Sequence, residues 1–117
     1  MNDKTTQTLQ AQGSPILLLA YLHKEMSHLT APSFTIHGHA PTELHIHLHR
    51  SVPGEVPALT AFEEWRTALG LGLPSQGGGS TVSWLSTEGR VDDVAVVLTG
   101  YGTPSEVEAA VAELVAA

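Results

Sequence analysis

The sequence predicts an α+β fold, a two-layer sandwich in which helices pack mainly on one face of a four-stranded, mostly antiparallel sheet. Residues 33–49 and 81–101 contain paired segments with the apolar–polar alternation typical of β-strands, and three other segments space their apolar residues as amphipathic helices do. The predicted order is α-ββ-α-ββ-α, so that 33–70 and 80–117 resemble two hairpin-plus-helix units.

The length of 117 residues fits one domain with its own core. Residues 1–13 are polar and predict a flexible N-terminal tail, which leaves 14–117 as the single α+β domain. The first helix is expected to begin at Ser14-Pro15, an N-cap followed by a first-turn proline, and to end at 30–32. Its apolar residues recur at helical spacing: Leu18, Leu19, Leu22, Met26 and Leu29.

The first predicted hairpin has one aliphatic and one polar face. The aliphatic face carries Phe34, Ile36, Gly38, Leu44, Ile46 and Leu48, and the odd-numbered positions are polar. For the two aliphatic faces to match across the hairpin, the numbers of paired residues must add up to an even number. A loop of three residues, either 40–42 or 41–43, meets this condition.

The second half begins after a proline-glycine connection at 51–57. Thr60 and Glu63 have the spacing of a capping box. The helix that they predict has an apolar stripe of Leu59, Phe62, Trp65 and Leu69, and Gly70 is a suitable stop. A loop at 71–80, strands at 81–87 and 94–101 joined by a turn at 88–89, and a last helix opened by the capping box Thr103–Glu106 complete the order. Trp65 and Trp84 are expected in the core.

The strand at 94–101 is apolar on both sides. Val94, Val96 and Leu98 point one way, and Ala95, Val97, Thr99 and Tyr101 point the other way. Strands of this kind are usually covered on both faces. Either the first helix crosses to the second face or another subunit covers it. We expect a homodimer with Val97 and Tyr101 in the interface, although Tyr101 would also fit as a packed residue with its hydroxyl at the rim.

Histidines concentrate on the polar side of the first hairpin, which holds five of the seven in the chain. Neutral imidazole is a good zinc ligand, and histidines on neighbouring strands can converge on one ion. The best candidate trio is His37, His45 and His47, with His39 and His49 as alternates and Glu43 as a nearby carboxylate. Two other interpretations remain open: a polar strand face without further function, and an interface that loosens when the imidazoles are protonated.

Composition excludes several function classes. The formal charge is −7, and the five basic residues form no stripe, which disfavours nucleic acid and anionic membranes as partners. The longest apolar run, 16–22, is far shorter than the ~20 residues of a membrane span, so a cytoplasmic location is expected. Gly77-Gly78-Gly79 lacks the lysine of a phosphate-binding loop, and neither a nucleophile elbow nor another catalytic or cofactor-binding residue is predicted. The expectation is a non-catalytic interaction protein without a cofactor; the alternative is a zinc-type metal-binding protein or enzyme.

Two segments carry a resemblance. AFEEWRTALG at 61–70 and VLTGYG at 97–102 are similar to short uncharacterised proteins of high-GC actinobacteria, especially streptomycetes, and of their phages and mobile elements. The similarity spans most of 14–102. It implies an accessory, phage-linked role and no particular activity, and the histidine run lies outside the residues that carry it.

Overall fold

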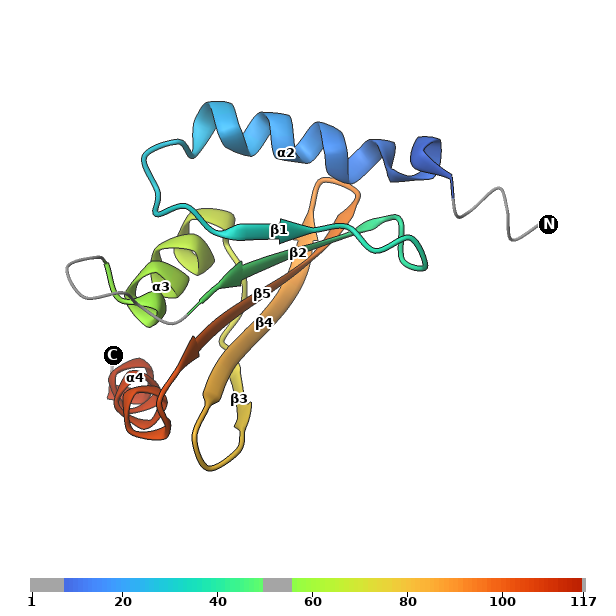
Figure 1. Cartoon of the computed structure of the whole chain (residues 1–117). Coiled ribbons are helices and arrows are strands. Elements are labelled where there is room, and N and C mark those ends of the chain that lie inside the picture. Colours follow the sequence, from blue (N-terminus) through green and yellow to red (C-terminus); the bar gives the residue numbers. More distant parts are fainter. Residues whose placement is uncertain (1–7, 50–55, 117) are drawn as a thin grey trace.

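The computed structural model describes residues 8–49 and 56–116 (Figure 1). The elements are the 3-10 turn η1 (Leu9–Gln12), helix α2 (Gly13–Glu25), strands β1 (Ser33–Thr35) and β2 (Glu43–Leu48), helix α3 (Ala58–Leu69), strands β3 (Ser75–Gly78), β4 (Ser83–Val91) and β5 (Val94–Gly102), and helix α4 (Pro104–Ala116). The class is α+β, as predicted. Most of the expected tail, residues 1–7, and most of the connection at 51–57 lie outside the described residues.

The predicted four-stranded, mostly antiparallel sheet with the order α-ββ-α-ββ-α is wrong. The sheet has five strands in the order β1-β2-β5-β4-β3, and it is mixed because β2 and β5 are parallel while the other neighbours are antiparallel. The extra strand, β3, lies in the segment predicted as a loop. Its sequence SQGG has no apolar alternation, so its extended form comes from pairing with β4 and not from side chains of its own.

The register between β1 and β2 follows the predicted parity. Ser33 pairs with His47 and Phe34 with Ile46, so the paired numbers add up to an even number. The three-residue loop is wrong, because β1 ends at Thr35 and β2 begins at Glu43. Backbone hydrogen bonds from Ala40 to His37 (3.1 Å) and from Glu43 to Ala40 (3.2 Å) form successive turns instead of a tight hairpin loop. His37 and His39 therefore lie in a connection and not on a strand.

The buried residues of α2, α3 and α4 join one core with one face of the sheet. Figure 1 shows α2 lying along this sheet. The sheet contributes aliphatic residues at alternating positions of its central strands: Leu44, Ile46 and Leu48 from β2, Val94, Val96 and Leu98 from β5, and Leu85 from β4. Phe62 of α3 is fully buried, and Leu18 and Leu22 of α2 join the same core. Because α2 packs on this side, it does not cross to the second face.

The ends of the helices follow the sequence in part. Gly70 closes α3 in the left-handed conformation (φ 67°), as expected. At the start of α4, the backbone N–H of Thr103 donates to Glu106 Oε1 (2.8 Å) and that of Glu106 to Thr103 Oγ1 (3.2 Å), which confirms the capping box. The capping box predicted at Thr60 and Glu63 is wrong: α3 begins at Ala58, and Glu63 binds Arg66 instead.

The turn between β4 and β5 lies later than predicted. β4 continues through Glu88 and Gly89, and the reversal occurs at Asp92 and Asp93, where Asp92 has a positive φ of 54°. Gly89 serves packing: a Cβ there would lie 2.8 Å from Leu71 Cδ2. The glycine that suggested a turn is thus needed inside the strand because Leu71 approaches it closely.

Gly100 of β5 provides a test of the contact between sheet and helix. A Cβ at this position would lie 2.8 Å from Phe62 Cβ, so Gly100→Ala should lower the free energy of unfolding by about 1–3 kcal/mol through overpacking. Urea denaturation measures the change. Gly72→Ala is the matched control, because a Cβ at Gly72 meets nothing within 4 Å. Equal stability of the two variants would contradict the close packing of α3 on β5.

Candidate functional site

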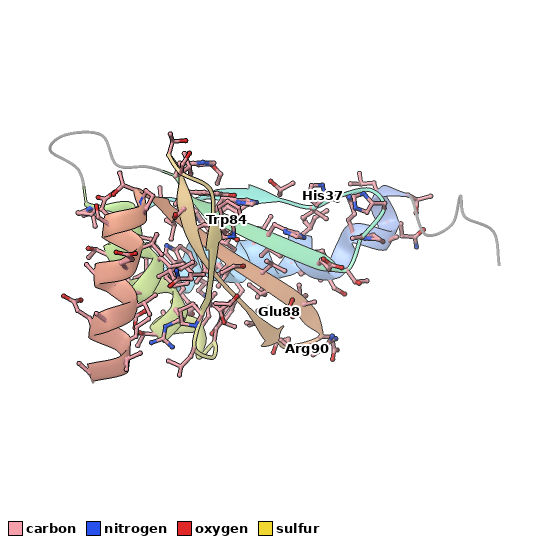
Figure 2. The ribbon with its side chains drawn as sticks, turned by 90° about the horizontal axis from the view of Figure 1, so that it is seen from below. His37, Trp84, Glu88 and Arg90 are labelled. Atoms are coloured by element: carbon pink, nitrogen blue, oxygen red, sulfur yellow. The ribbon has the colours of Figure 1, made fainter. Side chains whose placement is uncertain are left out.

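The candidate site lies on the sheet face opposite the helices, which we call the open face. The strand register assigns these residues to it: Ser33, Thr35, Glu43, His45, His47, Trp84, Ser86, Glu88, Arg90, Ala95, Val97, Thr99 and Tyr101. Figure 2 is seen from this side, with α2 behind the sheet, and Trp84, Glu88 and Arg90 follow one another along β4. Within 8–49 and 56–116, the buried core residues of the helices all belong to the other side.

Aromatic and imidazole rings form a continuous row across the open face, which we call the ring row. In sequence of contact its members are His39, His37, His45, His47, His49, Tyr101 and Trp84. The ring centroids of His39 and His37 are 5.2 Å apart, those of His37 and His45 4.9 Å, and those of His45 and His47 6.2 Å. His49 lies 6.1 Å from His47 and 5.8 Å from Tyr101, and Tyr101 lies 6.4 Å from Trp84.

The β2 backbone aligns the middle of this row. Alternate side chains of a strand share a face, so His45 and His47 point the same way and their rings stack at an interplanar angle of 14°. His37, from the connection, approaches His45 edge-on at 77°. Glu43, two residues before His45, places Oε1 3.1 Å from His45 Nε2. The row thus contains a carboxylate–imidazole pair at one end of β2.

His47 lies in the middle of the row, where its ring is close to those of His45, His49 and Tyr101. Partial burial lowers the pKa of its imidazole below 6.5, and the neighbouring His45, His49 and His37 lower it further by charge repulsion. Because the charged form is disfavoured, His47 is neutral at neutral pH and protonation must work against its surroundings.

The five predicted metal-ligand histidines are brought onto the same part of the molecule, but their rings do not converge. His45, His47 and His49 stack nearly in parallel, which aims their nitrogens in similar directions rather than at one point. Across residues 8–49 and 56–116, no group of three His, Asp or Glu side chains is arranged to hold a metal ion. A zinc ion on His37, His45 and His47 would require ring rotations, and such a site stays a prediction.

The two predicted interface residues lie half-buried on the open face. Val97 pairs with His45 on one side and with Glu88 on the other. Tyr101 stacks near His47, with ring centroids 6.3 Å apart, and its neighbour on β4 is Trp84. Both residues thus lie on the open face, where the ring of Tyr101 lies between those of the histidines and that of Trp84; their role in an interface stays a prediction.

The prediction that Trp84 belongs to the core is wrong, whereas that for Trp65 is confirmed. Trp84 is 38% exposed on the open face, because Leu85 occupies the core side of β4 and its neighbour must face away. The indole lies over Gly77: a Cβ there would be 2.7 Å from Trp84 Nε1. The glycine run before β4 could have indicated this position of Trp84, because an indole can lie over a neighbouring strand only where that strand has no side chain.

Comparison with protein-family models, with curated proteins and with solved structures found no match. In the part of the chain that the structure describes, no helix is both long enough and apolar enough to cross a membrane.

The lowered pKa of His47 predicts an acid-sensitive fold. Because the folded state holds fewer protons than the unfolded chain, the stability that neutral His47 contributes is present above pH 6.5 and is lost as the pH falls through the lowered folded pKa. His47→Gln should therefore lose less stability than the wild type between about pH 7.5 and about pH 5.5, as measured by urea unfolding. His23→Gln, at an exposed position of α2, should retain the wild-type dependence; equal curves for the His47 and His23 variants would contradict the prediction.

Proposed function

We propose that this protein is a non-catalytic interaction module that forms an acidic homodimer through the open face. The observation that carries the proposal is the ring row, which places half-exposed aromatic and imidazole groups on the sheet face opposite the helices that the structure describes. The resemblance to actinobacterial and phage proteins adds an accessory role to this proposal and contributes no activity.

The central strands support a second covering layer. β2 and β5 are parallel, and parallel pairs are usually covered on both faces. On the open face, β5 presents Ala95, Val97 and Tyr101, each of them half-buried, which a second layer would cover further. Two candidates to cover this face follow from the sequence, the first helix and another subunit. Because α2 packs on the core side, a second copy of the chain is the candidate that remains.

Charge also favours self-association at this face. With neutral histidines, the open face carries Glu43, Glu88 and Arg90, whereas the whole chain has a formal charge of −7. Two copies can therefore meet here with little repulsion. In a two-fold dimer the same patch contacts itself, which allows Glu88 of one copy to approach Arg90 of the other. Large aromatic residues such as Trp84 and Tyr101 are typical anchors of such contacts.

A matched pair of lysine substitutions tests the dimer. Val97→Lys puts a charge in the middle of the open face, and Val115→Lys puts the same charge on α4, where Val115 is 81% exposed. We expect the first variant to be monomeric and the second to be dimeric, as measured by light scattering after size exclusion. If the wild-type chain is still monomeric at about 100 μM, its affinity for itself is too low for a functional dimer, and the proposal is refuted.

A second variant guards against misfolding of the first. Trp84→Ser removes an exposed indole and should shift the equilibrium towards monomer with an unchanged circular dichroism spectrum. Acid should act in the same direction as Trp84→Ser, because protonation of imidazoles on both copies would place like charges across the interface, and Glu43 offsets only part of that charge. A dimer that is equally tight at about pH 5.5 and about pH 8 would exclude the histidines from the contact.

One contact favours a second function, metal binding. Metal-ligating histidines commonly donate their other ring N–H to a carboxylate, and Glu43 occupies that place beside His45 Nε2. The Nδ1 atom of His45 would then be the ligand. If this function holds, protein purified without a histidine tag binds zinc with a stoichiometry of about one per chain by calorimetry, and His47→Ala removes it while His23→Ala does not. Equal zinc binding by both variants would show that the metal binds elsewhere.

A further inference from the structure

A groove with a volume of about 1140 Å³ is lined mainly by α3 and α4, and Tyr101 of the ring row also lines it. Its apolar lining includes Leu59 and Phe62 from α3 and Ala109, Ala110 and Leu114 from α4. Small-molecule sites typically measure roughly 300–1,000 Å³, so this groove is large for a small ligand. Its size is better matched to a segment of polypeptide.

The α4 wall presents apolar surface that the fold does not fully use. Val107 is the helix's only completely buried residue among 104–116, at 1% exposure. Ala110 and Leu114, one and two turns further along the same side, are only half-buried. A stripe at this spacing is the usual contact surface for another helix. The groove thus provides one apolar side of a helix–helix contact.

The charged residues of the groove are all acidic. Glu63, Glu64, Glu106 and Glu113 line it, and among the described lining residues there is no Lys, Arg or His. Arg66 offsets the charge of Glu63, and Glu106 is engaged in the cap of α4. Among the described residues, Glu64 accepts a hydrogen bond from the Thr30 hydroxyl at 3.4 Å, which does not neutralise its charge. Glu64 and Glu113 therefore leave negative charge on the two walls.

We propose that this groove binds a basic amphipathic helix of a partner protein. The leucine and alanine lining would receive the apolar side of such a helix, and the glutamates would meet Lys or Arg residues that flank it. A second copy of this chain fits poorly, because its formal charge of −7 would bring carboxylates against carboxylates. The groove shares Tyr101 with the proposed dimer contact, but its α3 and α4 walls lie outside the open face, and the proposal does not depend on the dimer.

The test uses a fluorescein-labelled synthetic peptide of about 18 residues, with leucines on one helical side and lysines on the other, titrated with the full chain at about 0.15 M salt. Glu113→Lys should weaken binding by about tenfold, because it reverses a charge on the groove wall. Glu108→Lys is the matched control: it lies on the same helix, is exposed and changes the net charge equally, but it does not line the groove. It should weaken binding by less than about threefold.

Three outcomes would overturn the proposal. Equal weakening by Glu108→Lys and Glu113→Lys would show attraction to the acidic molecule as a whole. Equal binding of a peptide with glutamate in place of lysine would remove the role of charge. A change of oligomeric state on Glu113→Lys, at a pH where the wild type is stable, would show that the groove holds a second copy of this chain.

Discussion

The in-register parallel pairing of β2 with β5 is the constraint on which the rest of the structure depends. It sets Leu44 beside Val96 and Ile46 beside Leu98 on the side of the helices. The same register places His45 beside Val97 and His47 beside Thr99 on the opposite side. The same strand register thus determines both the core on one face of the sheet and the ring row on the other. A slip by one residue would bury imidazoles and expose leucines, so the core itself holds the histidines in place.

Features that are determined by residues close together in the sequence could be predicted from it. The alternation in 44–48 determined which side the histidines take, and the short-range contacts at Thr103 and Gly70 determined two helix ends. The sequence also placed Val97 and Tyr101 on the same face of their strand, because alternate residues of a strand point to the same side. In each of these cases the residue and its physical reason lie within a few positions of each other.

The features that were mispredicted depend on distant neighbours. β3 is extended because β4 lies beside it, and its own residues contain no such signal. Gly89 looked like a turn because its partner, Leu71, is far away in the chain. The parallel β2–β5 contact joins residues that no spacing rule connects, and Trp84 was assigned to the core because its pairing with Tyr101 was unknown. Tertiary context overrides local pattern at all of these positions.

The long connection between the two central strands has a consequence for how the chain folds. β4 and β5 are joined by a short turn at Asp92 and Asp93 and can pair quickly. β2 can pair with β5 only after the loop formed by residues 49–93 has closed, which is slower. Until then the hairpin presents an aliphatic strand with unpaired amides and carbonyls. Such an edge readily recruits other strands, so newly made chains are most prone to aggregate in this interval. We therefore expect the rate at which β2 pairs with β5 to determine how much of the chain aggregates while it folds.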